Sequence, residues 1–192
     1  GNCVEKVTIN NITGSGISPE LPSKKQRYSE GYHFIAIVTN KRVEVFRYKE
    51  VAKRAVEVLL FYEMRGDFRM IGFIVMPDHI HIICETQKAI SHIVRDVKKY
   101  IAKEAIRYLS TVNKELLSSI QLSKPKKKGH IYQFWQADFY DFNILTEGKL
   151  NEKLRYMYEN PVRKGLCDEI FDYEYSDIQR YFGSGDPKLP YG

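Results

Sequence analysis

The chain has 192 residues, enough for one domain that buries its own core without disulfides or a structural metal. Lysine and arginine number 30 against 24 acidic residues, and the net charge of +6 suits a polyanionic partner. The three cysteines are widely spaced, no signal-peptide pattern opens the sequence, and no apolar run approaches the roughly 18 residues of a membrane span. We therefore expect a cytoplasmic protein with reduced thiols and no membrane segment.

The first third of the chain predicts an arm, a strand pair and a helix. Residues 1–29 are polar and rich in Gly, Ser, Asn and Pro, which indicates an irregular N-terminal arm. Residues 32–48 contain two β-rich runs around Asn40, so we expect a strong strand followed by a short one. Apolar residues at helical spacing over 49–66 predict a helix that stops at Gly66.

A β-hairpin and a second helix follow. Residues 68–85 are β-rich on both sides of Met76-Pro77-Asp78. Because proline cannot donate to a sheet ladder and Pro-Asp favours a turn, we predict strands at 68–75 and 79–85. An apolar stripe at helical spacing predicts an amphipathic helix over 90–109.

The last third contains a basic loop at 123–130, an aromatic segment at 131–147 that should hold the final strand, and a helix at 150–165 that Pro161 bends or ends. We place one domain over residues 30–182 and a tail over 183–192. The order of elements predicts an α+β fold, an antiparallel sheet with helices packed on one face.

Two of the five histidines lie one residue apart in the apolar segment FIVMPDHIHIIC. Residues i and i+2 of a strand share a face, so His79 and His81 should project side by side, with Ile80 and Ile82 on the other face. Neutral imidazole is a common ligand for divalent metals, and the pair would form half of a metal site. The short pattern alone favours a simpler interpretation, two polar residues on the solvated face of a strand.

The helix at 150–165 offers the other half of a site in its segment RYMYENPV. An advance of about 100° per residue puts Tyr158 in the apolar stripe and Tyr156 on the opposite face. Asn160 lies four residues after Tyr156 and therefore on the same face. We expect Tyr158 to pack in the core, and Tyr156 and Asn160 to point together away from the stripe. Tyr100, at the edge of its own helical stripe, is expected to be structural.

The segments MPDHIHII, FWQADFYDFNI and YMYENPVRKGL, in this order, resemble the REP-associated tyrosine transposases. These are single-tyrosine HUH transposases, where HUH means His-hydrophobic-His, and the resemblance covers about residues 32–166. It implies a ferredoxin-like sheet with helices, the HUH endonuclease fold. It also implies that His79, His81 and Asn160 are the metal ligands and that Tyr156 is the nucleophile.

The resemblance implies a DNA strand transferase that cleaves and rejoins single-stranded DNA beside a hairpin. The intermediate would be a 5′-phosphotyrosine, and the cofactor a divalent metal, Mg²⁺ or Mn²⁺. Basic and aromatic side chains are the candidate DNA contacts, although the lysines equally suit a solvated loop and most of the aromatics suit the core. These candidates are Lys124, Lys126, Lys127, Lys128, Trp135 and Arg163.

Two other functions remain open at this point. In a metal-dependent phosphoesterase, water rather than Tyr156 would attack, and a covalent DNA adduct separates the two chemistries. In a DNA-hairpin-binding module without catalysis, the same DNA would bind and no adduct would form. The resemblance also leaves open whether the chain acts alone or as a homodimer.

Overall fold

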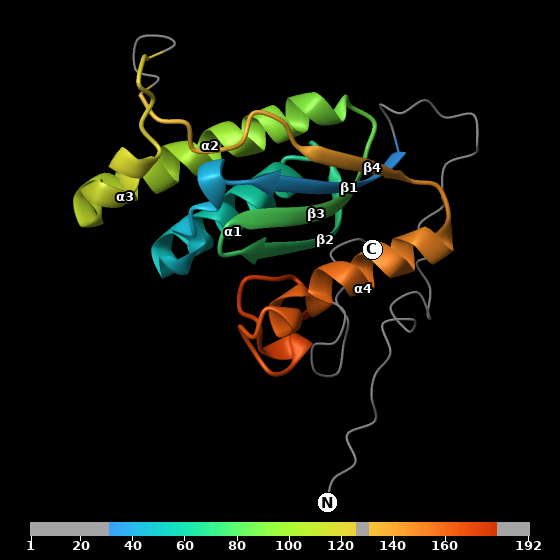
Figure 1. The fold of residues 1–192 in the computed structure, drawn as a ribbon. Helices are drawn as coiled ribbons and strands as arrows, with labels where there is room; N and C mark the ends of the chain where they lie inside the picture. Colours follow the sequence, from blue (N-terminus) through green and yellow to red (C-terminus); the bar gives the residue numbers. More distant parts are fainter. Residues whose placement is uncertain (1–30, 126–130, 180–192) are drawn as a thin grey trace, which may run out of the picture.

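A computed structural model describes residues 31–125 and 131–179 (Figure 1), so the predicted arm at 1–29 and tail at 183–192 lie outside the described residues. Four antiparallel strands form one sheet in the order β2-β3-β1-β4. One helix connects β1 to β2 and another connects β3 to β4, which is the ferredoxin-like arrangement. The strands are β1 (Gly31–Val38), β2 (Arg69–Met76), β3 (His79–Thr86) and β4 (Tyr140–Ile144).

The predicted helices are present, with ends that differ by a few residues. Helix α2 runs one turn further than its apolar stripe, and α4 begins three residues earlier than predicted. The helices are α1 (Lys49–Met64), α2 (Ile90–Val112), α3 (Lys114–Ser119) and α4 (Glu147–Arg163). Pro161 lies in the last turn of α4 without ending it, and Gly165 follows the helix with φ +67°, a backbone conformation that favours glycine. None of the described helices is long and apolar enough to cross a membrane.

The short second strand predicted after Asn40 is wrong. The chain there forms two 3₁₀ turns, η2 (Asn40–Arg42) and η3 (Val45–Arg47). Lys41 and Arg42 both have φ 53°, and the hydroxyl of Thr39 donates to the backbone carbonyl four residues on, which closes the turn. Strand β1 is already paired with β3 on one side and β4 on the other, so a hairpin partner has no edge to join.

The sheet is apolar on both faces. Helices α1 and α2 cover one face, against Ile80 and Ile82 of β3, and α4 covers the other, against Phe34 and Ile83 (Figure 1). The predicted α+β class with an antiparallel sheet is confirmed, but the helices do not all share one face. The strands carry apolar residues in consecutive positions, and both of their faces therefore need cover.

Helix α4 is held tightly against strand β2. A Cβ placed on Gly72 would lie 2.7 Å from the Tyr158 hydroxyl and 2.8 Å from Met157 Cε, so glycine is what permits this approach. The Tyr158 hydroxyl donates to Asp177 Oδ1 at 2.8 Å, and the same carboxylate oxygen accepts from the backbone N–H of Phe73 at 2.7 Å. These contacts fix the position of α4 on the sheet, and with it the position of the side chains on the other face of the helix.

Candidate active site

The two histidines of β3 face α4 and are buried. His79 is 9% exposed and His81 is 5% exposed, and their ring centroids are 4.7 Å apart. The simpler interpretation, two polar residues on a solvated strand face, does not describe them, because α4 covers this face. Burying two imidazoles side by side costs free energy unless something bonds to their nitrogens.

Helix α4 brings the other two predicted site residues to these histidines. The ring of Tyr156 lies 5.8 Å from that of His81, and Asn160 Nδ2 lies 3.2 Å from His79 Nε2. Asn160 is 5% exposed, whereas Tyr156 is 48% exposed, so the tyrosine forms the open side of the cluster. Both residues point away from the helix stripe that holds Tyr158, as predicted, but toward the histidines and not simply outward.

Hydrogen bonding orients His79. Its Nδ1 is 2.5 Å from Asp78 Oδ1, and the other carboxylate oxygen of Asp78 accepts from Arg42 Nη1 at 2.9 Å. When Nδ1 carries the proton for this bond, the lone pair is left on Nε2, the nitrogen directed at Asn160. A carboxylate behind a histidine in this way is a recurrent feature of metal sites, where it fixes the tautomer and the ring orientation.

His81 is the polar group most in need of a partner. Neither of its ring nitrogens has a hydrogen bond of normal length and angle within residues 31–125 and 131–179. Buried polar groups in native proteins are almost always bonded, and an exception often marks the place of an ion or ligand. Two histidine nitrogens and the Asn160 amide, which can turn to present its oxygen, are donors that fit a divalent cation.

Both imidazoles are kept neutral. Burial lowers the pKa of His81 to about 3, with a further contribution from the neighbouring His79. Burial also lowers the pKa of His79, although the hydrogen bond to Asp78 opposes this. The pKa of Asp78 is below its usual range because hydrogen bonds from His79 and Arg42 outweigh the effect of burial. Neutral imidazole is the form that donates a lone pair to a metal.

No group of three or more His, Cys, Asp or Glu side chains suited to a metal occurs in the described part of the chain. A third protein ligand at the histidine pair must therefore come from another residue type. Asn160, which the sequence motif implies as that ligand, is the residue whose amide lies beside His79.

Two cations lie over the aromatic rings of the site. The Arg163 guanidinium is 4.7 Å from the centroid of Tyr156, and its Nη2 donates to the Tyr156 carbonyl at 2.6 Å. Lys153 Nζ is 5.0 Å from the centroid of Phe34, the ring that stacks on His81. Lys153 was not among the predicted residues, although its position three residues before Tyr156 puts both on one helix face.

The other predicted DNA contacts lie elsewhere. Trp135 is 7% exposed, packs against Phe46 and Phe134, and donates from its indole N–H to the Lys98 carbonyl at 2.8 Å. That burial leaves almost no ring surface for a base, so we assign Trp135 to the core. Lys124 is exposed near the basic loop, whereas the predicted contacts Lys126, Lys127 and Lys128 lie outside the described residues.

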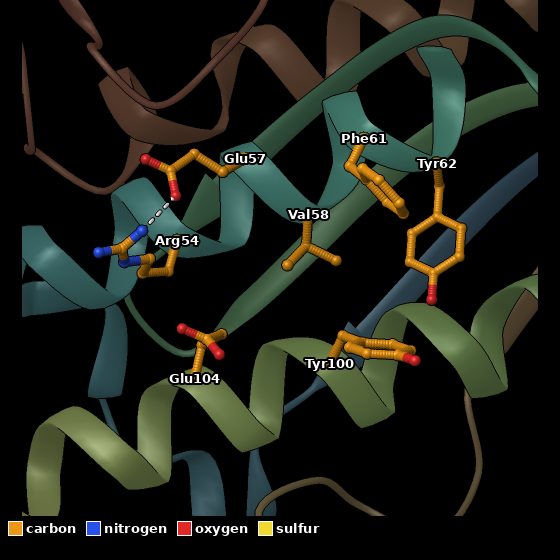
Figure 2. A pocket seen from close by; sticks show the side chains of 7 residues that line it. All are labelled: Arg54, Glu57, Val58, Phe61, Tyr62, Tyr100 and Glu104. Atoms are coloured by element: carbon orange, nitrogen blue, oxygen red, sulfur yellow. Dashed lines mark hydrogen bonds and ion pairs between the residues drawn. The ribbon is translucent and has the colours of Figure 1, made fainter. Parts of the chain in front are cut away.

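A groove between α1 and α2 lies on the opposite side of the sheet (Figure 2). Its lining is aromatic and charged, and an Arg54–Glu57 ion pair spans 2.9 Å at one end. Among its lining residues are no histidine, cysteine or amide, so it offers little for metal or phosphate chemistry. The lining residues are Arg54, Glu57, Val58, Phe61, Tyr62, Tyr100 and Glu104.

Comparison with known proteins gives the family. A family model described as "Transposase IS200 like" matches residues 26–156, more than half of the chain and a span that includes His79, His81 and Tyr156. The chain belongs to the IS200-like transposase family. The resemblance to the REP-associated members, first seen in three sequence motifs, is confirmed by the relatives that follow.

One curated relative is a candidate REP-associated tyrosine transposase of Haemophilus influenzae, 26% identical over 114 residues. The aligned region makes up 59% of this chain and 60% of that protein, so the chain spans about three fifths of its relative.

Two solved structures are similar. One is a REP-associated tyrosine transposase bound to a REP hairpin, with a TM-score of 0.56, 19% identity, and coverage of 86% of this chain and 93% of that chain. At this identity the likeness shows a shared fold. The other is a candidate transposase from Deinococcus radiodurans, with a TM-score of 0.46, 17% identity, and coverage of 72% and 95%.

Proposed function

We propose that this transposase is a single-tyrosine DNA strand transferase, which cleaves and rejoins single-stranded DNA beside a hairpin with the help of a divalent metal. The observation that carries the proposal is the meeting of two distant segments. Tyr156 lies against His81, and Asn160 lies against His79, which it follows by 81 residues in the sequence. The related structure that holds a REP hairpin supports a DNA hairpin as the partner.

His79 Nε2, a ring nitrogen of His81 and the Asn160 amide oxygen would hold the cation, Mg²⁺ or Mn²⁺. When bound there, it would neutralise the charge that develops on a phosphodiester under attack. The protein itself keeps the two histidines in the state and orientation that a cation needs. Burial keeps both imidazoles neutral, Asp78 orients His79, and no hydrogen bond of normal length and angle from the described residues occupies the nitrogens of His81.

Tyr156 would be the nucleophile. Its oxygen forms a bond to phosphorus, the bond from phosphorus to the 3′ oxygen breaks, and that oxygen leaves as a 3′-hydroxyl after taking up a proton. A second 3′-hydroxyl can reverse the step, which conserves the energy of the phosphodiester. Tyr156 is 48% exposed and open to a DNA strand, whereas Tyr158 is 1% exposed and its hydroxyl donates to Asp177. The Arg163 guanidinium beside Tyr156 would pair with the incoming phosphate.

A denaturing gel tests the proposal. Labelled DNA hairpins with single-stranded flanks are incubated with the full chain and Mn²⁺ or Mg²⁺, with and without EDTA. We expect a slow covalent band that needs the metal, that Tyr156→Phe removes, and that the control Tyr158→Phe retains at a temperature where both variants are folded.

Other outcomes would overturn the proposal in favour of a different function. Metal-dependent cleavage with no covalent band indicates a water nucleophile and therefore a phosphoesterase. Tight binding of a hairpin with neither cleavage nor band indicates a DNA-binding module.

A further inference from the structure

We propose that Tyr140 is a stacking platform for one unpaired base of the DNA strand, next to the phosphodiester that Tyr156 attacks. The inference rests on the proposed function and assigns a nucleobase-binding site to it. Tyr140 is the first residue of the edge strand β4 and is 52% exposed.

The sheet register puts Tyr140 in line with the histidines. Ala36 of β1 pairs with His81 of β3 on one side and with Tyr140 of β4 on the other. Directly opposite residues share a face, so these three side chains form one row on the α4 side. With neighbouring strands about 4.8 Å apart, the backbones of His81 and Tyr140 are about 10 Å apart. The residue between them contributes only a methyl group.

One ring holds the cluster together. Phe34 stacks on His81 with centroids 5.1 Å apart, and it meets Tyr140 at 6.2 Å and Tyr156 at 6.1 Å in edge-to-face contacts. Tyr140 is therefore anchored on one side by the same residue that packs against the proposed nucleophile. Its other side is open, and a base that stacked there would be close to Tyr156.

The exposed aromatic rings support a specific role for this position. Four aromatic residues are strongly exposed among the described residues. Phe61 and Tyr100 line the groove between α1 and α2, whereas Tyr140 and Tyr156 both contact Phe34 at the candidate active site. Single exposed rings are common on protein surfaces, whereas exposed rings gathered beside a candidate active site suit a binding surface.

The charges around Tyr140 suit a strand of single-stranded DNA. Lys153 Nζ lies 4.7 Å from the centroid of Phe142, on the same face of β4 as Tyr140, and Arg163 lies over Tyr156. Glu159 is the acidic neighbour of Arg163, at 3.5 Å on the exposed side of α4. Cations interleaved with rings bind single strands generally, because the cations pair with phosphates while the rings stack on bases.

The alternative is that Tyr140 only shields Phe34 from water. The two roles differ in what can replace the ring, since a leucine shields Phe34 but cannot stack on a base. The test uses the full chain with Tyr156→Phe, so that no strand is cut. Its probe is the labelled hairpin with single-stranded flanks that binds this protein most tightly in a pool of randomised flanks.

In this background Tyr140→Leu should weaken binding of the probe by roughly 5- to 150-fold, the range for loss of one base–aromatic stack. Tyr140→Phe should bind like the parent. Tyr100→Leu is the matched control, because Tyr100 is a tyrosine of similar exposure, 43%, in the groove beyond the sheet. Binding by Tyr140→Leu within twofold of the parent would overturn the inference.

A series of probes, each with one abasic nucleotide, then locates the base. At one flank position the abasic site should weaken binding to the parent and leave binding to Tyr140→Leu unchanged. If Tyr140→Leu weakens binding by the same factor wherever the abasic nucleotide is placed, the inference is overturned. If thermal unfolding shows Tyr140→Leu to be misfolded, Tyr140→Met, which also covers Phe34 without an aromatic ring, takes its place and should show the same weaker binding.

The same probes, offered to the chain that retains Tyr156, separate this inference from the proposed function. If the chain forms a covalent band, but the effect of Tyr140→Leu on binding does not depend on the position of the abasic nucleotide, only the base site is overturned. If an abasic nucleotide at one position removes the effect of Tyr140→Leu, and the chain that retains Tyr156 forms no covalent band, the base site is supported and the strand transferase is overturned.

Discussion

Strand β3 presents Ile80 and Ile82 to α1 and α2 on one side of the sheet, and His79 and His81 to α4 on the other. All four side chains are nearly as buried as one another, with exposed fractions of 0%, 3%, 9% and 5%. The difference is chemical, since on the first face packing satisfies everything these residues present, whereas on the second neither nitrogen of His81 has a hydrogen bond of normal length and angle from the part of the chain that the structure describes. Burial by itself therefore does not distinguish a core from a site, and the bonding capacity of the buried groups has to be considered with it.

The strongest test of this difference is to truncate two adjacent residues of β3 that face opposite sides of the sheet. Ile82→Ala should lower the free energy of unfolding by about 2–5 kcal/mol, because it opens a cavity in a packed core. His81→Ala should lower it by less than about 1 kcal/mol, because removing two buried nitrogens that lack a hydrogen bond of normal geometry among the described residues offsets the lost contacts. Urea unfolding of both variants without metal measures the difference.

The effects of these two variants on activity should be the reverse of their effects on stability. His81→Ala should abolish the metal-dependent DNA adduct, whereas Ile82→Ala should retain it at temperatures where the protein is folded. If His81→Ala destabilises the fold as much as Ile82→Ala does, the histidine is a core residue and the comparison between the two faces fails.

A second variant links packing to the site through α4. Gly72→Ala places a methyl group within 2.8 Å of Met157 Cε and 2.7 Å of the Tyr158 hydroxyl, which Asp177 holds in place. Methionine can adjust, but the tyrosine cannot move without losing its hydrogen bond, so we expect a loss of about 1–3 kcal/mol.

Because the displaced helix carries Tyr156 and Asn160, adduct formation should also slow in Gly72→Ala. Denaturant unfolding and single-turnover rates, measured on the same preparation, check the two effects. A loss of stability with an unchanged rate of adduct formation would mean that the position of α4 does not determine the geometry of the active site.

Much of this architecture is readable from the sequence because it depends on local pattern. β-rich composition around the Pro-Asp turn predicts the strands of the hairpin, and helical periodicity predicts the helices α1, α2 and α4, to within a few residues. Helical geometry also separates Tyr156 from Tyr158, and the structure gives them exposed fractions of 48% and 1%.

Features that depend on tertiary partners were not readable in this way. The segments of β2 and β3 are apolar on both faces, so their pattern gives no sign of which side α4 takes. The β-rich residues after Asn40 form 3₁₀ turns because both edges of β1 are occupied. An aromatic residue such as Trp135 suits a stacking surface and a core equally well in sequence, and only its 7% exposure decides.

A third variant concerns the support behind the histidines. Asp78→Ala removes the carboxylate that contacts His79 Nδ1 and should weaken Mn²⁺ binding about 10- to 100-fold, the usual effect of losing a residue that orients a ligand. Asp78→Asn retains an acceptor at that position and should lose less. Calorimetric titration of the intact chain with Mn²⁺ gives both affinities, and equal affinity in Asp78→Ala and the parent would show that His79 is oriented without Asp78.

The smallest expected effect lies at the far end of the same helix. The Thr146 hydroxyl caps α4 by accepting from the Lys149 backbone N–H at 3.2 Å, at an exposed position. Thr146→Ala should therefore lower the free energy of unfolding by about 0.5–1 kcal/mol, the lower part of the range for a lost cap. Tyr156 is ten residues, or about 15 Å, further along the helix, among the residues Leu154, Met157 and Tyr158 that hold α4 to the sheet at Gly72. Fraying of the first turn should thus leave the rate of adduct formation unchanged, so this variant is the matched control for Gly72→Ala. A rate that fell in both variants would mean that α4 responds as one rigid body, and that its whole length positions the tyrosine.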